Sequence, residues 1–121
     1  MPQNFKLFGV EGGVCMDGQE YVNEVLRTYA GSDGVFDKLC LGVLGLAGET
    51  GEVVDMVKKA LYQGHAVDPE RFVDELGDVL WYVVLICSAL GFSLEQVMTA
   101  NVIKLRRRYP LGFDPGRSMN R

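Results

Sequence analysis

The most constraining feature of the sequence is a helical segment that is apolar on almost every side. Asp68 and Pro69 are typical of an N-cap and a first helical residue, and Gly91 is typical of a helix end, so a helix is predicted between them. At about 100° per residue, its apolar side chains cover nearly the whole circumference. They are Leu76, Val79, Leu80, Val83, Val84, Leu85, Ile86 and Cys87. Such a helix must be surrounded by other apolar surface.

The apolar part of this segment is too short to cross a membrane. Residues 79–90 are followed by Gly91 and preceded by Asp78, whereas a membrane span needs roughly 18 to 20 apolar residues. The N-terminal residues have a broken apolar pattern and one Lys, which is not typical of a secretory signal. We therefore expect a soluble, cytoplasmic protein without a membrane partner.

Three further helices are predicted around this one. The spacing of apolar residues predicts a short helix over 17–29 and a long helix over 35–62. A fourth helix is predicted from Ser93, with Gln96 as its capping-box partner, to about Arg108. No segment has a strand pattern. The expected fold class is all-α, of the four-helix-bundle type.

The length of the chain bears on its organisation and assembly. With 121 residues it suits one domain, and we divide it into an N-terminal arm (1–16), a helical domain (17–110) and a C-terminal tail (111–121). A chain this short has few helices with which to surround the apolar one. A homo-oligomer, either a dimer or a tetramer, is therefore expected.

Charge limits the classes of partner. The chain has 12 Lys and Arg against 16 Asp and Glu, a net charge of -4, which does not resemble the basic footprint of a nucleic-acid binder. An acidic protein that handles phosphates needs a cation to do so. Cys15, Cys40 and Cys87 lack metal-type spacing and are expected to be reduced thiols.

Four glycines follow one another at a spacing of three inside the long helix: Gly42, Gly45, Gly48 and Gly51. Each costs a helix up to about 1 kcal/mol relative to Ala. Such a row indicates close approach of another helix or of a ligand, or else a bend, and of these we favour close packing of a helix.

Two pairs of carboxylates are the candidate functional centre. Glu49 and Glu52 stand three residues apart, as do Glu75 and Asp78, so each pair lies on one face of its helix. The 22 residues between the pairs suit an antiparallel hairpin that would bring the two faces together. Two explanations remain open at this point: the acids pair with basic side chains or line a solvated edge, or they bind cations. A cluster of oxygen ligands alone selects Mg²⁺ or Mn²⁺.

The chain resembles the MazG-like branch of the all-α nucleotide pyrophosphohydrolases. Glu49-Thr-Gly-Glu52 and Glu75-Leu-Gly-Asp78 match the ExxE and ExxD motifs of that family. Further similar segments extend from about residue 19 to the end of the chain. They include Gln19-Glu20-Tyr21, Leu46-Ala47-Gly48, Gln63-Gly64-His65, Asn101 to Lys104, and Arg108-Tyr109-Pro110 ahead of Gly112-Phe113.

The resemblance implies an enzyme that hydrolyses nucleoside triphosphates between the α and β phosphates, releasing a nucleoside monophosphate and pyrophosphate. The four acids would hold Mg²⁺, with Mn²⁺ as a substitute, and Glu49 or Glu52 would orient the attacking water. Asn101 and Lys104 would contact the nucleotide and its phosphates, with Arg108 as a further contact on the same face. Such an enzyme would serve house-cleaning or control of the nucleotide pool.

The sequence allows other functions and other residue roles. Tyr21 could stack on a base, although a Tyr at helical spacing more often belongs to the core. Di-iron bundles use Glu-x-x-His pairs, and neither acid pair here contains a His. The remaining alternative is a non-catalytic helical module that binds nucleotide or regulates a partner, which an assay of phosphate release would separate from an enzyme.

Overall fold

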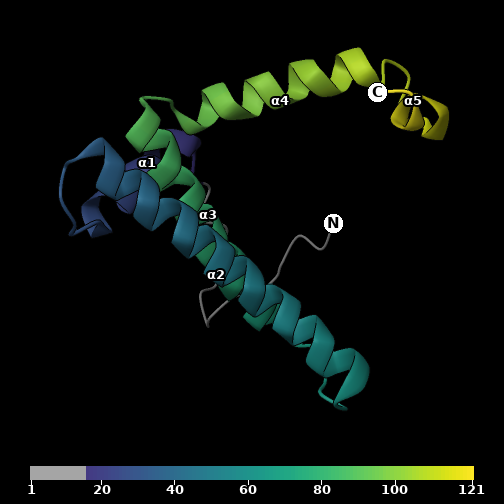
Figure 1. Cartoon of the computed structure of the whole chain (residues 1–121), viewed down its shortest axis with the longest axis horizontal. Helices are drawn as coiled ribbons and strands as arrows, with labels where there is room; N and C mark the ends of the chain where they lie inside the picture. The colour runs from purple at the N-terminus through teal and green to yellow at the C-terminus, as the bar shows by residue number, and fades with distance from the viewer. Residues whose placement is uncertain (1–15) are drawn as a thin grey trace.

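The computed structural model describes residues 16–121, and these residues form an all-α fold, as the sequence predicts (Figure 1). The first four helices lie where they were expected. A short fifth helix lies in the predicted tail and was not foreseen. The elements are α1 (Gly18–Thr28), α2 (Val35–Tyr62), α3 (Pro69–Leu90), α4 (Leu94–Arg108) and α5 (Pro115–Met119). The predicted arm, apart from residue 16, and Cys15 lie outside the described residues, whereas Cys40 and Cys87 are free thiols.

Capping side chains and a glycine account for several of the helix ends. The Asp17 carboxylate accepts from the backbone N–H of Glu20 at 2.8 Å, and the Glu20 carboxylate accepts from the backbone N–H of Asp17 at 2.9 Å. Ser93 and Gln96 form the same reciprocal capping box at the start of α4. Gly91 ends α3 in the left-handed region, at φ 77°, which a residue without a Cβ adopts at little cost.

α2 and α3 pack side by side as an antiparallel hairpin. Two of the four glycines in the row lie where the helices are in close contact. A Cβ at Gly42 would lie 2.6 Å from Ile86 Cγ1, and a Cβ at Gly45 would overlap the ring of Tyr82. At Gly48 and Gly51 no atom of residues 16–121 lies within 4 Å of the same position. The prediction of close packing is therefore confirmed at two of the four glycines.

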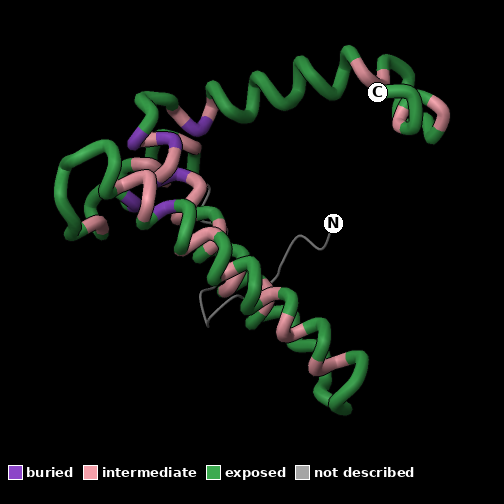
Figure 2. Tube along the Cα trace, viewed as in Figure 1, coloured by how far each residue is buried: buried purple, intermediate pink, exposed green. Residues whose placement is uncertain are grey.

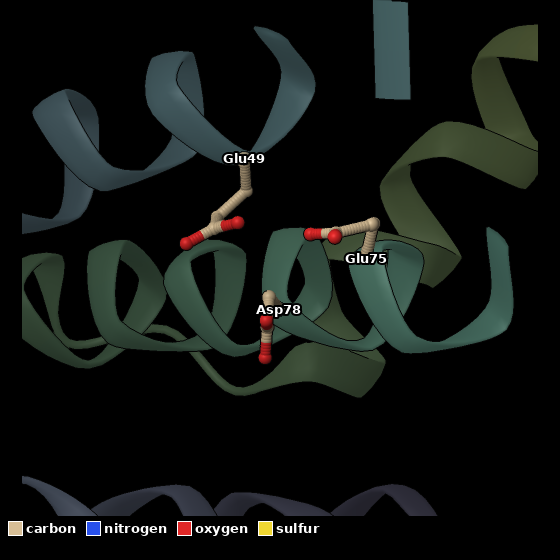
Figure 3. Close-up of side chains that lie close together, drawn as sticks. All are labelled: Glu49, Glu75 and Asp78. Atoms are coloured by element: carbon tan, nitrogen blue, oxygen red, sulfur yellow. The ribbon is translucent and has the colours of Figure 1, made fainter. Parts of the chain in front are cut away.

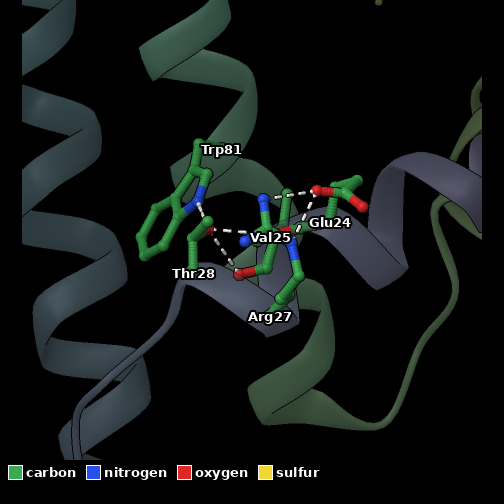
Figure 4. Close-up of polar contacts among 5 residues, drawn as sticks. All are labelled: Glu24, Val25, Arg27, Thr28 and Trp81. Carbon is green, nitrogen blue, oxygen red and sulfur yellow. Dashed lines mark hydrogen bonds and ion pairs between the residues drawn. The ribbon is translucent and has the colours of Figure 1, made fainter.

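A small hydrophobic core holds α1 against the end of this hairpin. Val25 of α1, Val84 of α3 and Leu94 of α4 are buried against one another. Beside them the indole Nε1 of Trp81 donates a 2.8 Å hydrogen bond to Thr28 Oγ1 (Figure 4). The Thr28 hydroxyl also lies 2.9 Å from the Val25 carbonyl oxygen, so the last turn of α1 is held from two sides.

α4 leaves the hairpin and runs away from it. Its axis bends 99° from that of α3, and only Leu94 of this helix is buried (Figures 1 and 2). Figure 2 shows the buried residues gathered where α1, α3 and the start of α4 meet. Within residues 16–121 no single helix has the length and apolar character to cross a membrane; by those two criteria alone, only the bent pair α3 and α4 passes.

The apolar helix predicted to be surrounded is covered along only part of its length. Val84, Leu85 and Cys87 near the end of α3 are buried. Leu76 and Leu80, nearer its start, are 52% and 41% exposed. The helical material of one chain therefore covers one end of α3 and leaves the other in contact with solvent.

Candidate metal centre

Three carboxylates from two helices converge near the middle of the hairpin. Glu49 reaches from α2 toward α3, where Glu75 and Asp78 stand about one turn apart (Figure 3). One oxygen atom from each of the three residues lies within 4.8 Å of the other two. Glu49 and Glu75 are half-buried, and Asp78 is exposed. This distance allows all three carboxylates to bind a single cation, or to share two.

The register of the hairpin explains why these residues meet. Gly42 lies against Ile86 and Gly45 lies against Tyr82, so about one turn forward along α2 corresponds to about one turn back along α3. Continuing the register by one turn brings Glu49 opposite Asp78. The glycines thus set the helices close enough for the carboxylates to reach across.

The carboxylates near Glu49 affect its pKa. Its pKa is raised above the ordinary value of 4.5, first by burial and then by the negative charges of Asp78, Glu75 and Glu52. A raised pKa of this origin means that the ionised set is unfavourable without a cation. Bound Mg²⁺ would reverse the balance by favouring the ionised carboxylates.

Basic side chains do not neutralise the cluster. Within residues 16–121 no Lys or Arg forms an ion pair with any of its three members. Asp55, one turn beyond Glu52 on α2, pairs with Lys58, at 2.7 Å, and with Lys59. These two lysines hold the pKa of Asp55 down at about 2. Of the two explanations open from sequence, ion pairing with basic residues is thus absent in the described residues.

Glu52 stands beside the cluster and is not one of the three that meet. It is exposed on α2, one turn beyond Glu49, and it acts on that residue through its charge. The predicted role of Glu52 as a ligand remains a prediction.

Tyr21 lies between the core and the acids. Its half-buried ring packs against the buried cluster of Val25, Val84 and Leu94. Its hydroxyl lies 3.4 Å from the carbonyl oxygen of Gly77, the residue before Asp78. The pKa of Tyr21 is raised, by burial and then by the charge of Asp78. The ring therefore has the core position that the sequence favoured, with its polar end at the border of the acid cluster.

The predicted substrate-binding residues of α4 are not brought to this cluster within one chain. Asn101 and Lys104 are exposed on the part of α4 that runs away from the hairpin. Arg108 lies at the far end of α4, where it lines a cavity together with residues of the C-terminal segment. Sequence reasoning passed over the tail arginines Arg117 and Arg121 in this cavity, although an Arg-rich, Gly-containing tail was a visible signal.

The donor set fits a hard divalent cation. All the converging groups are carboxylate oxygens, and no His or Cys among the described residues belongs to the cluster. Mg²⁺ and Mn²⁺ prefer such oxygen ligands, whereas zinc and iron sites in helical proteins use His or Cys. The open side beside Gly48 and Gly51, where nothing lies within 4 Å of an added Cβ, leaves room next to Glu49.

Comparison with known proteins agrees with the resemblance seen in the sequence. The signature of the MazG nucleotide pyrophosphohydrolase domain matches residues 42–113, which include all four predicted acids. The chain is also 35% identical over 96 residues to the Gene 37 protein of Mycobacterium phage L5, covering 76% of this chain and 84% of that protein. None of the solved structures matches.

Proposed function

The chain belongs to the MazG nucleotide pyrophosphohydrolase family, and on that basis we propose that it hydrolyses nucleoside or deoxynucleoside triphosphates to the monophosphate and pyrophosphate, with Mg²⁺ as cofactor. Its proposed role in the cell is house-cleaning or control of the nucleotide pool. One observation supports the chemistry most strongly. Glu49, Glu75 and Asp78 place carboxylate oxygens within 4.8 Å of one another with no basic partner among the described residues.

The residues have distinct tasks in this proposal. Glu49, Glu75 and Asp78, joined by Glu52, hold the cation, which neutralises phosphate charge and makes a water more acidic when bound. Glu49 or Glu52 would in addition orient the attacking water and take up its proton as a base. Phosphoryl-transfer enzymes depend mainly on position and charge neutralisation, and a rigid pair of helices supplies the first of these.

We further propose that the active form is a homodimer or homotetramer. Apolar side chains such as Leu44 on α2 and Ile103 on α4 are 74% and 61% exposed in the single chain. Asn101 and Lys104 lie on the projecting α4, away from the acids of their own chain. In an assembly α4 would lie against another copy, and its polar face would contact a nucleotide there.

The decisive experiment separates the two possible phosphate products. Purified protein is incubated with a panel of canonical and modified triphosphates, and orthophosphate is measured with and without added inorganic pyrophosphatase. We expect orthophosphate only when pyrophosphatase is present, and a monophosphate as the nucleotide product. Orthophosphate without pyrophosphatase, together with a diphosphate, would mean a different reaction.

Two controls make the result specific. Excess EDTA should abolish turnover, since the proposed site contains only carboxylates. Saturable nucleotide binding without any product across the panel would favour the non-catalytic module instead.

A further inference from the structure

Tyr21 connects the hydrophobic core to the turn of α3 that carries Glu75 and Asp78. Its ring packs against the buried cluster that α1, α3 and α4 share. Its hydroxyl donates a hydrogen bond of 3.4 Å to the carbonyl oxygen of Gly77. One side chain of α1 therefore contacts the core with its ring and the acid-bearing turn of α3 with its polar end.

The accepting oxygen belongs to the peptide group that leads into Asp78. The carbonyl of Gly77 and the amide nitrogen of Asp78 form one planar unit, which ends at the Cα atom of Asp78. A hydrogen bond to that oxygen therefore restrains the backbone from which the Asp78 carboxylate extends. Within α3 the same oxygen accepts from the backbone N–H of Trp81, as in any α-helix. Tyr21 adds a second donor from outside the helix.

Gly77 is the residue of this turn whose backbone most needs such a restraint. It is the only glycine in α3. A glycine inside a helix loses more conformational freedom on folding than any other residue and weakens the helix relative to Ala. Close packing does not require it, because an added Cβ at Gly77 would meet no atom of residues 16–121 within 4 Å. The point of greatest backbone freedom in α3 thus lies directly before Asp78.

α1 is itself held against α3, so it can act as a support. The indole Nε1 of Trp81 donates a 2.8 Å hydrogen bond to Thr28 Oγ1 in the last turn of α1 (Figure 4). Val25, which lies between Tyr21 and Thr28 in the sequence, is 1% exposed. The backbone that carries Tyr21 is therefore fixed relative to α3, and its hydroxyl stays within reach of the same carbonyl.

We propose that Tyr21 is a positioning residue for the acid cluster: its hydroxyl restrains the peptide group between Gly77 and Asp78 and so fixes the Asp78 carboxylate within the cluster. Supporting contacts behind the ligands are a general feature of metal sites. This role differs from stacking on a base, because the hydroxyl rather than the ring is the acting group. The inference rests on the proposed metal centre, whereas the restraint on Gly77 is measurable without metal.

Tyr21→Phe removes the hydroxyl and keeps the ring on the core. In EDTA it should speed amide exchange in residues 78–81 by about threefold or more, because this turn of α3 loses a restraint. The affinity of the nucleotide-free protein for Mn²⁺, followed by electron paramagnetic resonance, should fall by about threefold or more. Tyr29→Phe is the matched control, because the Tyr29 hydroxyl also donates to a backbone carbonyl, that of Ser32. It should leave both readouts within about 1.5-fold of the wild type.

A second change tests whether the restraint is the cause of the effect. Gly77→Ala narrows the backbone freedom of the same turn, so in the Tyr21→Phe protein it should return the Mn²⁺ affinity to within about twofold of the wild type. Gly51→Ala changes the corresponding glycine before Glu52 on α2, where an added Cβ likewise meets no atom of residues 16–121. It should not restore the affinity of Tyr21→Phe.

Three results would contradict the positioning role. Exchange in Tyr21→Phe that is unchanged, or that changes as much in Tyr29→Phe, would overturn it. Equal recovery with Gly77→Ala and Gly51→Ala would also do so, since it would describe a general gain in helix stability. A raised KM for the nucleotide with unchanged Mn²⁺ affinity would make Tyr21 a substrate contact instead. If the wild type bound no Mn²⁺, the proposed metal centre would fail, while exchange in EDTA would still decide for or against the restraint.

Discussion

The ring of Tyr82 occupies the space beside Gly45 in which a Cβ atom would lie. This contact between α3 and α2 lies one helical turn from Glu49, so it sets the distance across which that carboxylate must reach. The packing of the Tyr82 ring on Gly45 therefore helps to determine the spacing of the carboxylates in the acid cluster.

Alanine at two glycines of the same helix should have opposite effects on folding. Gly45→Ala forces Tyr82 to move and should lower the free energy of unfolding by about 1 to 3 kcal/mol. Gly48→Ala adds a methyl group to open space and should raise it by up to about 1 kcal/mol through helix propensity. Denaturant titration of both variants in EDTA is the measurement. A loss at Gly48 as large as that at Gly45 would contradict the expectation and show that this side of α2 is covered in solution.

Replacing Asp78 should separate catalysis from folding. Asp78→Asn removes a charge that destabilises ionised Glu49, so the metal-free protein should melt at the same temperature or higher, while turnover falls by about 100-fold or more. The stabilisation caused by Mg²⁺ should also shrink. The matched control is Asp55→Asn, the same chemical change on a residue paired with Lys58 and Lys59, which should keep turnover and lose a little stability. Retained activity in Asp78→Asn would refute its assignment as a metal ligand.

Glu49 should make stability and metal binding depend on pH in opposite directions. Because its pKa is raised in the folded state, the ionised form costs the native protein stability above that pKa. As pH falls toward 4.5, protonation of Glu49 removes this cost, and Glu49→Gln should remove it at every pH. Mg²⁺ needs the ionised form, so its apparent affinity should fall by up to about tenfold per pH unit below the raised pKa. Melting curves from neutral pH downward, with and without Mg²⁺, check both trends; parallel trends would count against this role for Glu49.

The apolar stripe of α4 should hold copies of the chain together. Met98, Val102 and Leu105 share one face of the helix and are each more than 40% exposed. Met98→Glu should shift the protein toward monomer, whereas Ala100→Glu, an exposed position on the opposite face, should not. Light scattering at micromolar concentration measures the difference. A wild-type monomer under these conditions would contradict the proposed assembly.

Most of the secondary structure could be predicted from local signals. The boundaries of α3 follow from Asp68, Pro69 and Gly91, and the start of α4 follows from Ser93 and Gln96, because each signal acts within a few residues. α5 was missed since Asp114 and Pro115 begin a helix of only five residues, too short for an apolar period to develop.

The arrangement of the helices was harder to foresee. Spacing predicted that the two acid pairs would face each other, and Glu49, Glu75 and Asp78 do meet. Spacing did not separate Gly45, where an added Cβ would meet Tyr82, from Gly48, where it would meet no described residue, because that difference depends on where the partner helix diverges. The direction of α4 was equally hidden, since it depends on the turn at Gly91 and on a core of a few side chains.

The sharp departure of α4 at Gly91 has a consequence for how this helix exchanges its amide protons. Beyond Leu94 the helix has no residue that the described part of its own chain buries, and an isolated helix of 15 residues is marginally stable in water. Protection of these amides against deuterium would therefore come from whatever covers α4 rather than from the hairpin that precedes it. The rate of amide exchange in α4 therefore reports whether another surface covers this helix. Exchange is slow where the helix is covered and fast where it is exposed to solvent.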